Sequence, residues 1–218
     1  MTKSNSINQY LRQTQDIYGD KLYLKINKKT NIANSSENSL EDFNYAINTC
    51  QKCQLGNSRN NFVFGAGDKN ADLLLVGEAP GEKEDLEGIP FVGRAGKLLD
   101  KILSAISLSR DKGVYICNVL KCRPPDNRDP LPSEIEQCEP YLKEQINLIK
   151  PKLIVALGRV AAKTLLKNDL ALKDMRLIKH DYYGTPLIAT YHPAALLRNQ
   201  NLKPAAWEDF KWIRNLIN

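Results

Sequence analysis

The sequence of 218 residues lacks an apolar run that approaches the roughly 20 residues a membrane-spanning helix needs. Its first residues also lack the apolar core of a signal peptide. We therefore expect a soluble protein of the cytoplasm. The sequence contains neither the Gly-Lys-Ser/Thr ending of a Walker loop nor a G-x-G-x-x-G fingerprint, so two familiar phosphate-binding loops are excluded.

The composition is that of one folded domain. Hydrophobic residues make up 42% of the chain, and its length is sufficient for a substantial core. The formal net charge is +6. A basic protein is compatible with a nucleic-acid partner, but many basic proteins bind none, so charge alone does not identify the partner.

Apolar runs alternate with amphipathic stretches along the chain. Four short apolar runs predict strands at residues 73–76, 114–120, 153–157 and 187–191. Helical patterns predict helices at residues 95–108, 133–150, 158–167 and 204–216, the second of them opened by a capping box at Ser133. Alternating strands and helices form a parallel sheet covered on both faces. We therefore predict a three-layer α/β/α fold with a central four-stranded parallel sheet.

Residues 1–44 are predicted to be an N-terminal accessory segment or linker, and residues 45–218 the functional domain. Residues 6–18 have the pattern of a short helix, while residues 27–38 are rich in Asn, Ser and Lys and offer almost nothing to bury. An ordered extra helix packed on the core is the alternative. A capping box at residues 39–42 is predicted to open a helix.

The stretch from Leu73 to Gly96 is the centre of the sequence. Its apolar run is followed by a predicted loop with four glycines, two prolines and five acidic side chains, before a helix that starts near Arg94. Glycines let a backbone approach a ligand closely, and prolines fix the shape of a loop. A polar loop between a strand and a helix N-terminus is how open α/β sheets build ligand sites.

Four chemically interesting residues follow the four predicted strands. They are Glu78, Asn118, Gly158 and His192. Because the carboxyl ends of parallel strands meet at one edge of a sheet, we expect these residues to share one crevice although they lie far apart in the sequence.

The five cysteines include a set with the spacing of metal ligands. Cys50 and Cys53 form a C-x-x-C pair, and Cys122 and Cys138 flank a proline-rich loop. By count, these four suit Zn²⁺ or a [4Fe–4S] cluster equally well; disulfides are the alternative, which an intracellular location disfavours. Cys138 is predicted to lie in the first turns of a helix, where the dipole favours a thiolate. Cys117 is predicted to be a small core residue.

Three motifs carry a resemblance to a known family. They are Gly77-Glu78-Ala79-Pro80-Gly81 with the downstream Pro90-Phe91-Val92-Gly93-Arg94, then Asn118-Val119-Leu120-Lys121-Cys122-Arg123-Pro124-Pro125, and finally His192-Pro193-Ala194-Ala195-Leu196-Leu197-Arg198. With the cysteine spacing, residues 45–217 closely resemble family 4 uracil-DNA glycosylases, the iron–sulfur branch of the uracil-DNA glycosylase superfamily. The resemblance implies that superfamily's fold and an enzyme of base excision repair that hydrolyses the N-glycosidic bond of uracil in DNA, leaving an abasic site.

The resemblance also implies a cofactor, a [4Fe–4S] cluster whose ligands are Cys50, Cys53, Cys122 and Cys138. We expect its role to be structural, because it would join the loop at residue 50 to the loop of residues 122–138 and no acid–base candidate lies near it in the sequence.

Three residues are expected to handle the base. His192 is the catalytic candidate that donates a hydrogen bond to O2 of the departing uracil; the alternative is a histidine that only caps the last helix. The Asn118 amide is expected to read uracil through N3–H and O4, the alternative being a turn at a strand end. Phe91 is expected to stack on the base flipped out of the DNA, unless it folds into the core.

The loop after the first strand supplies further candidates. Glu78 is the second catalytic candidate, either orienting water or balancing charge on the sugar. Family 1 relatives place an aspartate one position later, where this chain has Ala79, so no general base transfers directly. Gly77 and Ala79 are expected to line the uracil pocket, and Glu84 to lie near C5 of the base and help exclude thymine.

Basic side chains are expected to contact DNA phosphates. The candidates are Arg94, Arg123, Arg198 and Lys203, with Lys121 and Arg128 adding to a basic surface beside the cysteines. A solvated loop is the alternative for the set near residue 121. The expected partner is uracil-containing DNA, single- or double-stranded, bound by a monomer.

Two other classes of function compete with the enzyme. The domain could be a non-catalytic DNA-binding or polymerase-associated module of the same fold, or a zinc-stabilised α/β interaction domain. The presence of Glu78, Phe91, Asn118 and His192 together favours the enzyme.

Overall fold

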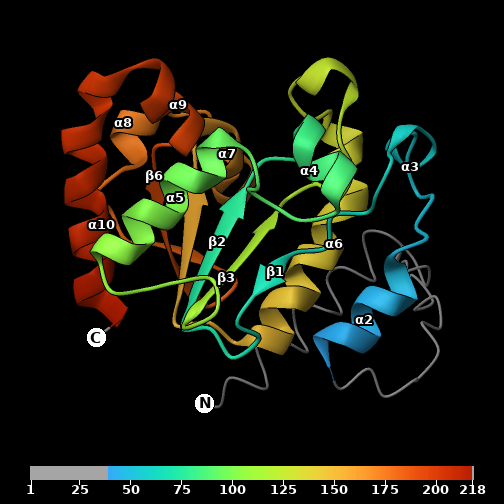
Figure 1. Ribbon diagram of the computed structural model, residues 1–218, viewed down its shortest axis with the longest axis horizontal. Helices are drawn as coiled ribbons and strands as arrows, with labels where there is room; N and C mark the ends of the chain where they lie inside the picture. The colour runs from blue at the N-terminus through green and yellow to red at the C-terminus, as the bar shows by residue number, and fades with distance from the viewer. Residues whose placement is uncertain (1–38, 218) are drawn as a thin grey trace, which may run out of the picture. The chain divides into compact units, whose positions relative to one another are not determined.

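The computed structural model describes residues 39–217 of the chain (Figure 1). The expected helix at residues 6–18 and the polar stretch at residues 27–38 lie outside this part. At the centre of the described part is a six-stranded sheet in the order β1-β3-β2-β4-β6-β5. Its strands are β1 (Ala66–Gly67), β2 (Leu73–Gly77), β3 (Val114–Asn118), β4 (Leu153–Leu157), β5 (His180–Tyr182) and β6 (Thr185–Thr190).

The four central strands are parallel, which confirms the predicted core of the sheet. β2 pairs with β3 on one side and β4 on the other, and β4 pairs with β6. Two short edge strands run antiparallel, β1 beside β3 and β5 beside β6. The prediction of four strands is therefore incomplete. β1 and β5 contain two and three residues and lack an apolar run that would reveal them in the sequence.

The helices flank this sheet. They are α2 (Leu40–Ile47), α3 (Leu55–Ser58), α4 (Glu82–Glu87), α5 (Arg94–Ala105), α6 (Pro132–Ile149), α7 (Arg159–Leu166), α8 (Leu172–Met175), α9 (Pro193–Arg198) and α10 (Lys203–Ile217), with 3-10 turns η1 (Pro125–Asn127) and η2 (Gln200–Leu202). None of the helices in the described part is long and apolar enough to cross a bilayer.

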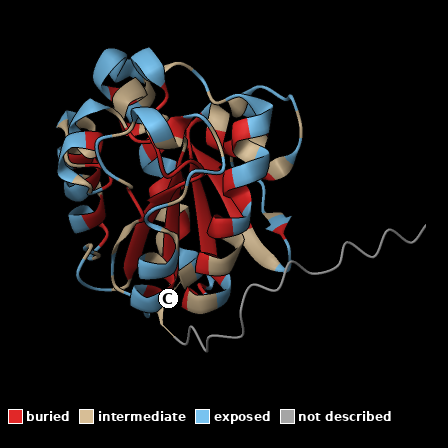
Figure 2. Cartoon of the chain, turned by 90° about the vertical axis from the view of Figure 1, so that its right-hand side faces the viewer, coloured by how far each residue is buried: buried red, intermediate tan, exposed pale blue. Residues whose placement is uncertain are grey.

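Two apolar clusters hold the three layers together. Successive residues of a strand point to opposite faces, so Leu74 and Val76 of β2 belong to the cluster that contains residues of α2, α6, α7 and α8. Leu73 and Leu75 belong to the other cluster, which contains residues of α5 and α10. Figure 2 shows the result: the central strands β2, β3 and β4 are buried along their whole length, and the helices expose their outer sides.

Helices α4 and α6 differ from prediction. Residues 82–87, expected within a loop, form α4, which begins after Gly81 and ends at Gly88 in the left-handed conformation with φ of 72°. Acidic residues in its first turn favour the helix by facing its positive end. Helix α6 begins at Pro132 rather than at a Ser133 cap, because the Glu134 carboxylate accepts the Leu131 N–H at 2.8 Å.

The first described helix does begin as predicted. The Ser39 hydroxyl accepts the N–H of Asp42 at 3.1 Å, as a helix cap does. Helix α2 then spans the expected boundary at residue 44 and buries Leu40 and Phe43 in the core.

Candidate active site

The carboxyl ends of the parallel strands border one cleft of about 580 Å³. Its lining includes Glu78 after β2, Asn118 at the end of β3, Gly158 after β4 and His192 after β6, together with Phe91. In Figure 1 the strand arrowheads point towards the end of the sheet where α4 and α9 lie. The structure therefore brings these strand-end residues together, in a cleft whose volume is typical of small-ligand sites.

Close packing at one side of the cleft requires Gly77. A Cβ atom at this position would lie 2.2 Å from Oδ1 of Asn118 and 2.9 Å from the ring of Phe91. Any larger residue would displace both side chains. Ala79, the other expected pocket residue of this loop, lines the cleft itself. The Phe91 ring packs with the His192 ring, the centroids 5.3 Å apart and the planes inclined by 29°.

His192 is held in a single tautomer. It is the N-cap of α9, where its Nδ1 accepts the N–H of Ala194 at 3.1 Å. Because Nδ1 is an acceptor, the hydrogen of the neutral ring is on Nε2. Burial of the ring and the nearby charge of Arg198 lower the pKa of His192 to about 4. At neutral pH the ring is therefore an uncharged N–H donor, and it caps a helix as well.

The pKa of Glu78 is shifted in the opposite direction, because burial disfavours the charged form of either group. Burial and the negative charge of Asp129 raise the pKa of Glu78 to about 7, although Arg159 opposes the change. Asp129 and Arg159 lie 3.8 Å apart between Oδ2 and Nη2 and also line the cleft. A carboxyl group that titrates near neutrality can hold or release a proton at working pH.

Glu84 also lines the cleft, but its carboxylate has a structural partner. Its Oε1 accepts the backbone N–H groups of Val92 and Gly93, at 3.2 and 3.3 Å. The carboxylate therefore braces the segment that enters α5, a role that the sequence did not suggest.

Asn118 is almost completely buried and rests on a buried lysine. The Lys121 ammonium donates to the Asn118 carbonyl at 2.7 Å and to Oε1 of Gln145 at 2.6 Å. Lys121 is 0% exposed. The expectation that it contributes to a basic surface is therefore wrong, because its charge is enclosed under the strand end.

The four predicted metal-ligating cysteines line a second, narrow pocket. Cys50 and Cys53 lie between α2 and α3, Cys122 follows β3, and Cys138 is in α6. All five cysteines of the chain are free, and Cys117 is buried in the core as predicted. Within the described residues, no three His, Cys, Asp or Glu side chains converge closely enough to hold a single metal ion.

Three of these sulfur atoms accept hydrogen bonds from groups around the pocket. The Arg59 guanidinium donates to Sγ of Cys122 at 3.2 Å, and the Tyr141 hydroxyl donates to Sγ of Cys50 at 3.2 Å. The N–H of residue 121 donates to Sγ of Cys138 at 3.3 Å. Donors aimed at sulfur suit thiolates that ligate a metal.

Burial has the larger influence on the Cys138 thiol, which lies in the second turn of α6. Cys138 is the seventh residue of α6 rather than a first-turn residue, and burial raises the pKa of its thiol to about 12. The dipole effect fades within the first turn, so desolvation is the larger influence here.

The predicted DNA-binding residues lie at different places. Arg198 lines the cleft, while Arg94 and Lys203 are exposed at the starts of α5 and α10. Arg123 is partly buried and donates to Oδ1 of Asn127 at 2.9 Å. Arg128, named with this group, lines the cleft but is paired with Glu134, with Nη2 and Oε1 2.6 Å apart.

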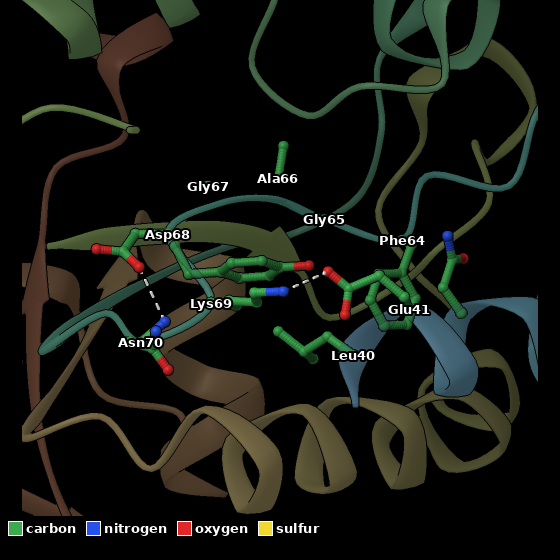
Figure 3. Close-up of a pocket in the computed structure, with 11 residues that line it drawn as sticks. Leu40, Glu41, Phe64, Gly65, Ala66, Gly67, Asp68, Lys69 and Asn70 are labelled. Carbon is green, nitrogen blue, oxygen red and sulfur yellow. Dashed lines mark hydrogen bonds and ion pairs between the residues drawn. The ribbon is translucent and has the colours of Figure 1, made fainter. Parts of the chain in front are cut away.

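A different hollow lies beside β1, away from the strand ends (Figure 3). Its charged groups already have partners: Lys69 pairs with Glu41 at 3.2 Å, and Asp68 accepts the N–H groups of Asn70 and Gly113. None of the strand-end residues lines it. The cleft is therefore the better candidate for chemistry.

Comparison with known proteins gives matches along most of the chain. Residues 64–211 match the family described as "Uracil DNA glycosylase superfamily". A type-4 uracil-DNA glycosylase of Archaeoglobus fulgidus is 46% identical over 186 residues, which cover 82% of this chain and 93% of that protein. One from Sulfurisphaera tokodaii is 46% identical over 187 residues, 82% of this chain and 84% of that protein.

A bacterial relative gives the same result. A type-4 uracil-DNA glycosylase of Thermotoga maritima is 40% identical over 185 residues, which cover 83% of this chain and 96% of that protein. Nearly the full length of that relative is thus represented. The family match includes the Gly77 loop and the His192 segment, and the chain belongs to the type-4 family within the uracil-DNA glycosylase superfamily.

Proposed function

We propose that this protein hydrolyses the N-glycosidic bond between uracil and deoxyribose in DNA, leaving an abasic site for base excision repair. The observation that carries the proposal is the pairing of a neutral His192, whose Nε2–H is free of the helix cap, with Asn118 and Phe91 in one cleft. The names of the relatives agree with it.

His192 is proposed as the group that stabilises the departing base. When the bond between C1′ and N1 breaks, its electron pair leaves with uracil, and negative charge develops on O2. A neutral imidazole N–H can donate to that oxygen without giving up its proton. Because the donor is already oriented by the Ala194 N–H, little reorganisation is needed in the transition state.

Asn118 and Phe91 are proposed to bind the flipped base. The Asn118 amide offers an acceptor to N3–H and a donor to O4, a pattern that cytosine reverses. The Phe91 ring offers a stacking surface, and Gly77 and Ala79 allow the loop backbone to approach the base. Wrong bases leave buried polar groups unpaired, which penalises them.

Glu78 is proposed to act on the water or the sugar. In its ionised form, the carboxylate can orient the attacking water or face the positive charge that develops on the sugar. Its raised pKa of about 7 makes this role dependent on pH. The water oxygen bonds to C1′ as the base leaves, and the proton passes to solvent or to a carboxylate.

Cys50, Cys53, Cys122 and Cys138 are proposed to hold a [4Fe–4S] cluster. A single zinc ion brings four sulfurs within about 4 Å of one another, given Zn–S distances of ~2.3 Å. The four cysteines line one pocket, as the ligands of one metal centre would, and membership of the type-4 family favours the cluster over zinc. When bound, the cluster supplies a rigid link between the two loops and takes no part in bond cleavage.

The remaining proposals concern the partner. Arg94, Arg123, Arg198 and Lys203 are proposed to contact phosphates of single- or double-stranded DNA. The protein is proposed to act in the cytoplasm as a monomer.

A single assay tests the activity. Purified protein is incubated with end-labelled oligonucleotides that contain one uracil or, as the control, one thymine at the same position, and then treated with alkali. We expect a strand break at uracil and none at thymine. Tight DNA binding without any break would instead support a non-catalytic module of the same fold.

A further inference from the structure

Phe91 has an unusual backbone conformation for its residue type. Its φ is 55°, in the left-handed region that bulky side chains rarely adopt. Its side chain nevertheless forms a wall of the cleft and packs with His192. A strained residue in a site persists only where its surroundings hold it. Neighbouring groups must therefore hold the backbone of Phe91 in this conformation.

Arg110 is the group that contacts this backbone most directly. Its Nη1 donates to the Pro90 carbonyl at 2.7 Å, and its Nη2 donates to the Phe91 carbonyl at 2.5 Å. Its Nε donates to Oδ1 of Asp100 at 2.7 Å, which orients the guanidinium from the other side. The Arg110 side chain is only 19% exposed. One planar guanidinium thus links two successive carbonyls to a carboxylate of α5.

The Phe91 carbonyl is enclosed on its other side by α5. A Cβ atom at Gly96 would lie 1.6 Å from the carbonyl oxygen, so only glycine fits there. The oxygen is therefore confined between Gly96 and the Arg110 guanidinium. Arg110 itself is not among the residues that line the cleft.

We propose that Arg110, oriented by Asp100, is a positioning residue that sets the Phe91 ring in the uracil pocket. The inference rests on the proposed function for the role of the ring, but its geometric part does not. Loss of the guanidinium frees the peptide after Phe91 to rotate, which moves the ring away from Gly77 and His192. Lysine cannot replace this contact, because one ammonium cannot present the planar fork that reaches all three oxygens.

Nuclear magnetic resonance tests the geometric part without any activity. The chain has two histidines, so the ring protons of His192 are easily assigned, with His180 as internal reference. The Phe91 ring shifts the His192 signals through its ring current, and Phe91→Leu should abolish that shift. We expect Arg110→Met and Arg110→Lys to move the His192 signals at least halfway to their Phe91→Leu positions, leaving His180 unchanged. Unchanged His192 signals in both folded variants would overturn the proposal.

A double-mutant cycle tests the functional part. Stacking is worth a factor of about 5–150 in base binding, so Phe91→Leu should weaken inhibition by free uracil within that range. Arg110→Met alone should weaken it about tenfold. In the Phe91→Leu background it should cost less than twofold, because Arg110 acts through the ring. Additive losses would contradict a positioning role.

Lys101→Met is the matched control, since it removes an exposed cation of α5 next to Asp100. It should change neither the His192 signals nor uracil inhibition. Melting temperatures, measured for every variant, separate loss of fold from loss of position. If the parent protein fails to cleave at uracil while the His192 signals respond as expected, the proposed function is wrong and the positioning of Phe91 stands.

Discussion

The cysteine pocket and the cleft differ in how far the protein itself supplies hydrogen-bond partners for their functional groups. In the cysteine pocket, three sulfur atoms already accept a hydrogen bond from Arg59, Tyr141 or the N–H of residue 121. In the cleft, the helix cap uses only Nδ1 of His192 and leaves its Nε2–H available, and the pKa of Glu78 is raised to about 7. The protein itself therefore orients the sulfur atoms of the proposed cluster site, whereas the cleft keeps a donor and a titratable carboxyl group available for a substrate.

One buried residue joins the two regions. Lys121 donates through its N–H to Cys138 and through its ammonium to the carbonyl of Asn118. The cysteine pocket and the proposed base reader are therefore held by the same turn after β3. A cluster held by the cysteines, as proposed, would fix one end of Asn118 without touching the substrate. Damage to the two regions should therefore have different consequences.

The largest effect is expected at the cysteine pocket. Cys122→Ala should abolish the brown colour and the broad absorbance near ~400 nm of anaerobically purified protein, and it should lower the melting temperature. Cys117→Ala, which alters a core residue on β3, should keep the iron. Iron analysis and thermal unfolding measure both. Colourless parent protein with stoichiometric zinc would refute the cluster.

The next effect is expected in the cleft and leaves the cysteine pocket intact. His192→Ala should slow uracil excision about 10²–10³-fold, because it removes one donor to the developing anion. Iron content and base preference should not change, since the proposed role of His192 concerns the charge of the leaving base and not the cluster or the base pattern. Single-turnover rates on uracil and cytosine oligonucleotides measure this. A variant that excises uracil at the parent rate would disprove the role.

The sequence predicts the cysteine pocket and the sheet better than it predicts the detailed contacts of the cleft. Parallel strands are buried on both faces, so their apolar runs are visible, and the spacing of the four cysteines is visible too. Lysine is rarely buried, so Lys121 could not be recognised as internal. The left-handed conformation of Phe91, its contact with Arg110 and the tautomer of His192 depend on contacts across the fold, which no local pattern encodes.

Asn118→Asp should change which base is excised, whereas His192→Ala should change only the rate. An ionised aspartate only accepts hydrogen bonds and repels O4 of uracil, so excision should fall about tenfold to a hundredfold. A protonated aspartate offers one donor and one acceptor in either order, so cytosine should be admitted in part. The uracil-to-cytosine rate ratio measures this. A ratio as high as the parent's would show that another group reads the base.

The smallest effect concerns Glu78 and pH. Its pKa of about 7 means that the carboxylate is mostly ionised at pH 8 and mostly protonated at pH 6. If the ionised form acts, excision should fall about tenfold from pH 8 to pH 6. His192, with a pKa of about 4, stays neutral throughout this range and cannot cause the change. Glu78→Gln should be slower and show no such inflection.

The stability of the folded protein should fall as pH rises through the titration of Glu78, whereas the excision rate should rise. A folded-state pKa above the ordinary 4.5 of glutamate means that the folded protein binds the Glu78 proton more tightly than the unfolded chain does. The stabilisation from that proton is complete below pH 4.5 and is lost as pH rises through 7. Relative to Glu78→Gln, the parent should therefore lose stability as excision increases.

Glu82→Gln, on the exposed side of α4, is the control and should retain both pH profiles of the parent. Parallel denaturation and rate measurements from pH 5 to pH 8 check both signs, and an inflection that survives in Glu78→Gln would assign the titration to another group.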